Sequence, residues 1–340
     1  MSHMKTIKDI RDFFLQGIHD GRALPLDEFL QTIPGYVSPA QNGLETIDMS
    51  IAQAYYQICE KMVADNLLVK VESNPMVCFQ NKYIGVHEVN SSNPDAFTRD
   101  IDYGAYDFKY RGFVYTRDYF THSVLQIEAQ YEDLRLDTGT AYYIGNNLFV
   151  TAAHCVNDVA RFNLLLPDGS PLELLEVWFA KGQDRNVFDL AIIRVDGKLT
   201  IPSFMLDTPA VLDEVLVMGF PPIANLPSIQ IAETATIGAY QKASTGQVVA
   251  NTTAYRTRID YFLINARVKG GNSGGPVINK EGKVTGTVVA LPYDLESEPN
   301  NPRYDIMGYG QCLPSKYVDE LLADPEQFPL HKDGKYYSFH

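Results

Sequence analysis

Apolar residues near the start of the chain recur at helical spacing. Residues 5–18 predict an amphipathic helix whose apolar positions are Ile7, Ile10, Phe13, Phe14 and Ile18. Residues 26–33 predict a second short helix, which Pro34-Gly35 ends, and residues 44–66 predict a long third helix. Short strands are then expected over residues 67–71 and 76–79, with a Ser-Asn-Pro turn between them.

The larger, later part of the chain has a different pattern, because short β-branched and aromatic runs alternate there with Gly, Pro and Asn turns. These runs predict strands over residues 123–129, 140–144, 148–151, 191–195, 215–218, 262–266, 276–279 and 284–290. Only residues 315–323 are expected to be helical in this part. Many short strands with few helices indicate β-barrels.

These patterns divide the chain into five segments. Residues 88–115 are polar and interrupted by turn residues, which is typical of a linker, although their aromatic residues favour docking on a neighbouring domain. We therefore expect an expression-tag remnant at 1–4, a helical domain at 5–88, a linker at 89–114, a β domain at 115–323 and a C-terminal extension at 324–340.

Charge and composition exclude several classes of function. The formal net charge of −14 is unfavourable for binding a phosphate backbone, so nucleic acid is not expected as a partner. No apolar run is long enough to cross a membrane, and the segment after Met4 has no secretory signal. No group of His, Cys and Asp has the spacing of metal ligands, so we expect neither a metal nor a cofactor.

Three short segments carry the candidate chemistry. They are Thr-Ala-Ala-His-Cys ending at Cys155, Asp-Leu-Ala-Ile-Ile beginning at Asp189, and Gly-Asn-Ser-Gly-Gly-Pro over residues 271–276. A serine hydroxyl is a weak nucleophile unless a neighbouring base takes its proton. The segments offer His154 as that base, Asp189 to orient it, and Ser273 to attack, with Asp184 as a weaker candidate for the orienting role. Each residue alone could be structural, since a turn aspartate or a glycine-rich turn is common.

The order His, Asp, Ser, separated by 35 and 84 residues, resembles the trypsin-like (chymotrypsin-fold) serine proteases. The resemblance covers roughly residues 115–320. It implies a mainly β fold with two six-stranded antiparallel barrels of the chymotrypsin type. It also implies an oxyanion hole formed by the backbone amides of Gly271 and Ser273. Asn272 stands where zymogen-type relatives carry an aspartate, which is closer to HtrA-type and other bacterial members.

The same resemblance suggests where a peptide substrate would bind. The residue six before the serine often lies at the base of the S1 pocket in such enzymes, and here it is Arg267, with Lys269 nearby. A cation at that place favours an acidic P1 side chain. The strand Val289-Ala290-Leu291 is expected to pair with the substrate backbone by β-addition.

The cysteines indicate a reducing compartment. Secreted relatives pair the cysteine after the catalytic histidine with one about 16 residues earlier, but that position here is Gly139. We therefore expect Cys59, Cys78, Cys155 and Cys312 to be free thiols in a cytoplasmic protein.

The N-terminal helices followed by a hairpin resemble a winged-helix module. Residues 1–85 contain seven Lys/Arg and ten Asp/Glu, and this balance is wrong for DNA. We interpret the module as a protein-interaction or regulatory element. A helical cap packed on the protease domain is an equally good interpretation.

The sequence favours an intracellular serine endopeptidase that hydrolyses peptide bonds through an acyl-enzyme intermediate. Regulation by a partner or by the N-terminal domain is expected, and a bacterial stress or defence role would fit. The alternative is a catalytically silent protease-fold scaffold, and a DNA-binding regulator is a third, weaker hypothesis.

Overall fold

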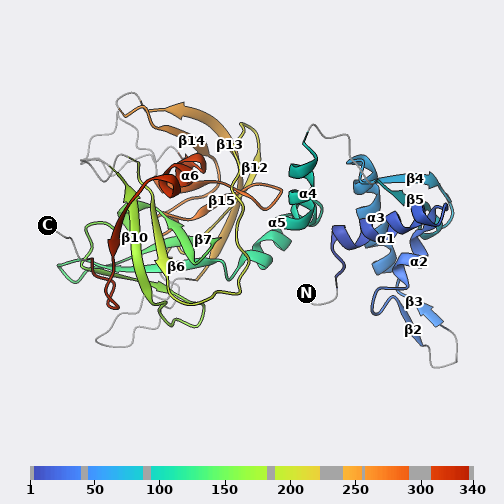
Figure 1. Ribbon diagram of the computed structural model, residues 1–340, viewed down its shortest axis with the longest axis horizontal. Helices are drawn as coiled ribbons and strands as arrows, with labels where there is room; N and C mark the ends of the chain where they lie inside the picture. Colours follow the sequence, from blue (N-terminus) through green and yellow to red (C-terminus); the bar gives the residue numbers. More distant parts are fainter. Residues whose placement is uncertain are drawn as a thin grey trace. The chain divides into compact units, whose positions relative to one another are not determined.

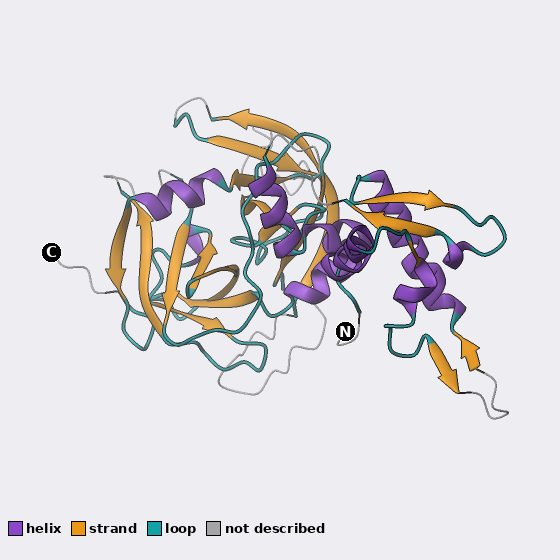
Figure 2. Cartoon of the chain, turned by 45° about the vertical axis from the view of Figure 1, so that its right-hand side comes forward, coloured by secondary structure: helices purple, strands orange, loops and turns teal. Residues whose placement is uncertain are grey.

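The computed structural model describes residues 4–39, 45–86, 93–181, 188–222, 240–254, 257–290 and 308–336 of the 340-residue chain. The chain divides into two compact units, Met1–Gly112 and Phe113–His340. Among the described residues, no helix has both the length and the apolar character needed to span a membrane. Helices dominate the first unit and strands the second (Figures 1 and 2).

The first unit contains three helices, a small sheet and a short ladder, followed by a fourth helix and the first half of a fifth, which continues past Gly112 into the second unit. In chain order the elements are α1 (Ile7–His19), β1 (Leu24–Pro25), α2 (Leu26–Leu30), β2 (Val37–Pro39), β3 (Glu45–Ile47), α3 (Met49–Ala64), β4 (Leu68–Glu72), β5 (Lys82–Gly85), α4 (Pro94–Tyr103) and α5 (Ala105–Phe120). The three-stranded sheet has the order β1-β5-β4, and β2 pairs with β3.

The expected helices are present, with two changes at their borders. Thr6 begins α1 with a capping box that it shares with Asp9, and Asp48 caps α3 by accepting hydrogen bonds from two backbone amides. The prediction of helix from residue 44 was wrong, since Glu45–Ile47 is strand β3. The expected strand at 76–79 was also wrong, because Cys78–Gln80 forms a 3₁₀ turn. The second strand of the hairpin is β5, which begins later, at Lys82.

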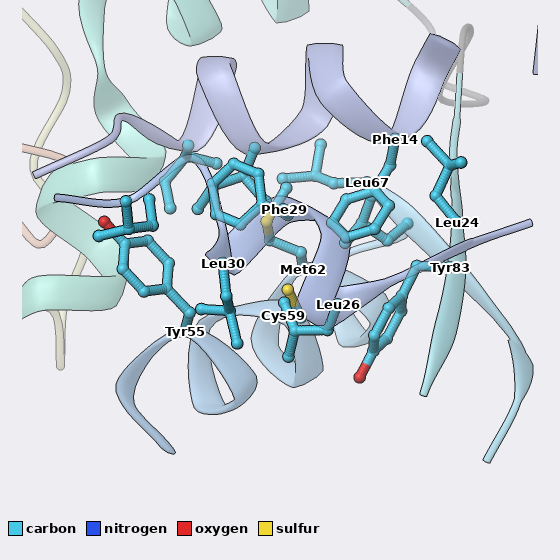
Figure 3. Close-up of a cluster of buried hydrophobic side chains, with 14 of the residues drawn as sticks. Phe14, Leu24, Leu26, Phe29, Leu30, Tyr55, Cys59, Met62, Leu67 and Tyr83 are labelled. Carbon is cyan, nitrogen blue, oxygen red and sulfur yellow. The ribbon is translucent and has the colours of Figure 1, made fainter. Parts of the chain in front are cut away.

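The core of the first unit is apolar and aromatic (Figure 3). Phe14 of α1 makes an edge contact with Tyr83 of β5, with ring centroids 5.5 Å apart. Phe29 of α2 makes a similar contact with Tyr55 of α3, also at 5.5 Å. The core therefore joins all three helices to the sheet, which gives this unit a hydrophobic centre of its own.

The segment that we expected to be a linker, residues 89–114, is largely helical where it is described. Asn93 caps α4 and Pro94 occupies its first turn, while Gly104 ends it in the left-handed region. Ile101 and Tyr110 are buried in the core of the first unit. At Gly112 the backbone leaves helical geometry, at φ 78°, which is where the two units divide.

The second unit is built almost entirely from strands. They are β6 (Val124–Gln130), β7 (Leu136–Gly145), β8 (Leu148–Thr151), β9 (Arg161–Leu165), β10 (Leu174–Ala180), β11 (Ala191–Val195), β12 (Glu214–Gly219), β13 (Lys242–Thr253), β14 (Asp260–Ile264), β15 (Pro276–Ile278), β16 (Val284–Ala290), β17 (Gly310–Pro314) and β18 (Pro325–Pro329). A 3₁₀ turn, Ala153–Cys155, follows β8, and α6 (Lys316–Ala323) precedes β18.

These strands form one closed barrel and one open sheet. The closed barrel has six strands in the order β12-β13-β14-β17-β16-β15, as expected for the second barrel. The other half differs from the expected six-stranded barrel, because seven strands lie in the order β18-β10-β11-β8-β7-β6-β9. The seventh strand, β18, comes from the segment expected to be a C-terminal extension, and it pairs with β10 and buries Phe328.

Candidate active site

The candidate base and its orienting carboxylate come from neighbouring strands. His154 lies in the turn after β8, and Asp189 lies just before β11, which pairs with β8. The Nδ1–H of His154 donates to Oδ2 of Asp189 at 2.6 Å, and the backbone N–H of His154 donates to Oδ1 at 2.9 Å. One carboxylate thus fixes both the ring and the backbone of His154, leaving Nε2 as the basic nitrogen.

Opposing effects act on the pKa of His154. Burial lowers this pKa, because it disfavours the charged imidazolium. The hydrogen bond to Asp189, the interactions with the neighbouring Cys155 and the charge of the Asp189 carboxylate together raise it by more, so the pKa lies above the ordinary value of 6.5. A carboxylate that stabilises the imidazolium is what a general base needs when it takes a proton.

Ser273 lies in a glycine-rich turn in front of β15. The N–H of Gly275 donates to the carbonyl of Asn272 at 2.8 Å, which places Ser273 and Gly274 at the centre of the turn. Gly274 has φ 81°, the left-handed conformation that the third residue of such a turn requires. The carbonyl of Ser273 accepts a weak hydrogen bond from Sγ of Cys155 at 3.5 Å, so Ser273 lies beside the residue that follows His154.

The amides of this turn divide into two groups. The N–H groups of Asn272, Gly274 and Gly275 donate to backbone carbonyls at 3.0, 2.7 and 2.8 Å. In the described part of the chain, the N–H groups of Gly271 and Ser273 have no such partner. These are the two amides that the sequence predicted for the oxyanion hole. An oxyanion hole requires such uncommitted donors, because a developing negative charge must be their acceptor.

Two buried threonines hold the serine turn in place. The Oγ1–H of Thr140 on β7 donates to the carbonyl of Gly271 at 2.7 Å, and the same oxygen accepts from the N–H of Phe220 at 3.1 Å. The N–H of Thr140 donates to the carbonyl of Ser273 at 2.9 Å. Thr151 on β8 donates its Oγ1–H to the carbonyl of Thr140 at 2.7 Å. The seven-stranded sheet thereby positions a turn that belongs to the closed barrel.

Neither threonine was identified from the sequence. Thr151 begins the Thr-Ala-Ala-His segment, and this position was the only available signal for it. Thr140 lies in an apolar strand pattern, where a threonine fits strand propensity and needs no functional explanation.

We expect Gly274→Ala to destabilise the second unit by about 2–5 kcal/mol, the sum of left-handed strain and backbone overpacking. A Cβ at Gly274 would lie 2.1 Å from the carbonyl oxygen of Thr140 and 2.2 Å from Oγ1 of Thr151. Urea unfolding measures the loss. Gly270→Ala is the matched control, since a Cβ there meets nothing within 4 Å. Equal stability of the two variants would contradict the tight packing of the serine turn.

We expect Thr140→Val to lower kcat by about 10–100-fold through misplacement of the Gly271 amide, equivalent to about 1.4–2.7 kcal/mol of activation free energy. The substitution keeps the shape of the side chain but removes both hydroxyl hydrogen bonds. Peptidase kinetics measure the effect, and Thr140→Ser should restore most of it. Thr285→Val is the control, because Thr285 is a buried threonine of the closed barrel whose hydroxyl donates to the carbonyl of Val277 and not to the serine turn. A loss of stability without a fall in kcat would show that Thr140 is structural only.

The residues predicted for substrate binding have mixed environments. Arg267 and Lys269 are exposed and line a pocket beside Asn272. On β16, Val289 is buried and Ala290 is exposed at the end of the strand, while Leu291 lies outside the described residues. The structure therefore places Val289 and Ala290 on a strand that contacts the serine turn, since Val288 pairs with Gly274 and Gly275.

The environment of Cys155 explains why its thiol is free. A Cβ added to Gly139 would lie 2.7 Å from Sγ of Cys155, so Gly139 stands where a disulfide partner would be. Cys59, Cys78 and Cys312 are also free. No three metal-ligating side chains gather within the described ranges.

Comparison with known proteins gives one family match and several relatives. Residues 139–286 match the family described as "Trypsin-like peptidase domain". "Serine endoprotease DegS" of Salmonella typhimurium is 29% identical over 182 residues, covering 52% of this chain and 45% of that protein. The Escherichia coli (strain K12) DegS is 28% identical over 204 residues, covering 54% and 51%. "Serine protease HTRA1B" of Danio rerio is 26% identical over 277 residues, covering 80% and 51%.

The chain thus spans about half the length of the curated relatives that it matches. Among solved structures, "HtrA-type protease AlgW with tripeptide" is similar with a TM-score of 0.46 and 18% sequence identity, covering 62% of each chain.

Proposed function

Because this chain contains a trypsin-like peptidase domain homologous to HtrA-type serine proteases, we propose that it is a serine endopeptidase. His154 acts as the general base and then the general acid, Asp189 orients it, and Ser273 attacks the scissile carbonyl. The observation that carries this proposal is the serine turn. It leaves the amides of Gly271 and Ser273 uncommitted, while the adjacent His154 is hydrogen-bonded to Asp189.

The proposed reaction has two stages. Ser273 transfers its proton to Nε2 of His154 as Oγ bonds to the carbonyl carbon, and the oxyanion that forms accepts from the two free amides. His154 then protonates the leaving amine, which gives the acyl-enzyme and the first product. Water repeats the sequence on the acyl-enzyme with His154 again as base, which releases the second product and Ser273.

Labelling with a fluorophosphonate probe tests the nucleophile directly. We expect the full-length protein to be labelled and the adduct to map to Ser273 by mass spectrometry, whereas Ser273→Ala remains unlabelled. Labelling of wild type only in the presence of cell lysate would indicate a partner-activated enzyme. If neither condition gives labelling, the alternative of a catalytically silent scaffold is favoured instead.

The activity should depend on pH through His154. A raised pKa means that the folded protein favours the imidazolium, so its stabilising contribution is present at low pH and is lost as pH rises through that pKa. The base must be neutral to act, so kcat/KM should rise with pH and reach half its maximum above pH 6.5. A pH–rate profile measures this midpoint. A midpoint well below pH 6.5 would contradict the stabilisation of the imidazolium by Asp189.

We propose that the first unit regulates the peptidase or recruits a protein partner. Its separate core supports a role as an independent module, and exposed Val69 and Val71 on β4 and Met76 beyond it offer an apolar surface for a protein. A winged-helix identity, a cytoplasmic location and a bacterial stress or defence role are parts of the same proposal. Low peptidase activity of the purified protein alone is the corresponding expectation.

An acidic P1 preference is the finer proposal for specificity. The exposed guanidinium of Arg267, two residues before Lys269, supports it. A cleavage profile of a peptide library tests it, and a profile without enrichment of Asp or Glu at P1 would remove it.

A further inference from the structure

A pocket of about 410 Å³ adjoins the serine turn. Its lining includes Lys242 and Ser244 from β13, Arg267 and Lys269 from the segment after β14, and Asn272, the neighbour of Ser273. None of the residues expected to pair with a substrate backbone is among the described residues that line it. Its described lining also includes none of His154, Asp189 and Ser273, so the pocket meets the serine turn at Asn272.

The charge of this pocket is opposite to that of the protein. The chain has a net charge of −14, but the described lining carries three cations and no carboxylate. Within the described part of the chain, the side chains of Arg267 and Lys269 have neither an ion-pair nor a hydrogen-bond partner. Three like charges that converge without a counter-charge repel one another, and a bound anion removes that repulsion.

Two side chains of the pocket, both from β13, are held by hydrogen bonds to backbone carbonyls. Nζ of Lys242 donates to the carbonyl of Pro221, and burial lowers the pKa of this ammonium group. Oγ of Ser244 donates to the carbonyl of Arg267 at 2.9 Å, which ties β13 to the segment that carries the other two cations. A partly desolvated cation interacts more strongly with an anion than a solvated one does.

We propose that this pocket binds a peptide carboxylate, with the planar guanidinium of Arg267 and the ammonium groups of Lys242 and Lys269 as the ligands. An arginine fork matches the two oxygens of a carboxylate, and two ammonium groups complete the neutralisation. The carboxylate can come from an acidic side chain of the substrate or from a separate acidic peptide.

A ligand in the pocket would also affect the conformation of the serine turn. This second half of the inference rests on the proposed function. The carbonyl of Lys269 accepts from the N–H of Asn272 at 3.0 Å, which closes a turn that contains Gly271 at φ 89°. A ligand that fixes Lys269 therefore fixes the turn that orients the Gly271 amide. Carboxylate binding and the competence of the oxyanion hole are thereby coupled.

Direct binding tests the site without any need for catalysis. Isothermal titration of acetylated tri-glutamate into the full-length Ser273→Ala protein should give saturable binding, whereas acetylated tri-glutamine should not bind. The double substitution Arg267→Gln with Lys269→Gln should weaken binding at least tenfold. Lys198→Gln, which removes an exposed cation after β11 that does not line the pocket, should leave the binding of tri-glutamate unchanged. Absence of saturable binding, or equal losses in both variants, overturns the proposal.

Kinetics on the wild-type protein separates the two sources of the carboxylate. If a separate peptide is the ligand, tri-glutamate changes kcat on a reporter with a neutral P1 residue and does not raise KM. If the substrate supplies it, tri-glutamate raises KM, and a reporter with Glu at P1 loses at least tenfold in kcat/KM in the double variant. Tri-glutamate that binds but leaves both constants unchanged overturns the coupling to the serine turn. Because titration uses a protein without its nucleophile, failure of catalysis and failure of binding remain distinguishable.

Discussion

Replacing Ser273 with alanine is expected to lower kcat by about 10⁶-fold, the loss that follows when the nucleophile of such a triad is removed. The turn itself should survive, because its hydrogen bonds are made by the backbone of Ser273 and its neighbours. The substitution removes one oxygen from a partly exposed side chain, so the thermal midpoint should change little. Peptidase turnover and a melting curve on the same preparation separate chemistry from stability.

The control for this variant is the same substitution at a surface serine outside the candidate site. Ser170 donates its hydroxyl to Asp168 on the surface of the seven-stranded sheet, so Ser170→Ala should keep full activity. Residual turnover of more than about 1% in the Ser273→Ala protein, insensitive to further purification, would place the nucleophile elsewhere. It would also remove the basis for treating the amides of Gly271 and Ser273 as an oxyanion hole.

The strands that sequence patterns predicted best are those buried on both faces. Nearly every residue of β8, β11 and β16 is buried, these strands are rich in β-branched and other apolar residues, and their observed bounds equal the expected ranges. β13 was missed because most of its residues are polar and alternate with half-buried positions. Its strand conformation depends on pairing with β12 on one side and β14 on the other, and pairing across the barrel is not encoded in any local window.

Local sequence patterns also failed in the expected linker, residues 89–114, and in the expected C-terminal extension, residues 324–340. β18 begins and ends with proline, which weakens any prediction of a strand, yet proline is tolerated at a sheet edge. The sequence does contain a signal for the start of helix α4, since Asn93-Pro94 is a helix cap followed by a first-turn proline. We nevertheless predicted a linker there, because the segment is polar and rich in turn residues.

The sequence predicted those site residues whose own side chains take part in the proposed chemistry, and it missed the residues that only position them. Asp189 and His154 were identified from their motifs and are hydrogen-bonded in the structure. The threonines that position the serine turn were not identified, because their hydroxyl groups act through backbone carbonyls from distant parts of the chain. Likewise, the cations at 242, 267 and 269 converge only after β12 and β13 have paired and the barrel has closed.

Replacing Asp189 with asparagine is expected to lower kcat by about 10⁴-fold, the loss that accompanies an inverted histidine tautomer in this kind of triad. Asparagine has nearly the same shape and can still accept from the backbone N–H of His154. Its amide nitrogen, however, would donate to Nδ1, where the carboxylate now accepts. The imidazole would then carry its proton on Nε2 and could not take one from Ser273.

The same variant tests the origin of the raised pKa. Loss of the carboxylate removes the contributions from Asp189 that raise the pKa of His154, while burial, which lowers it, remains. The midpoint of the remaining activity should therefore shift to lower pH than in wild type. Asp196→Asn, at an exposed residue directly after β11, is the matched control and should change neither kcat nor the midpoint. A fall in kcat with an unchanged midpoint would mean that Asp189 acts on the backbone of His154 rather than on its ring.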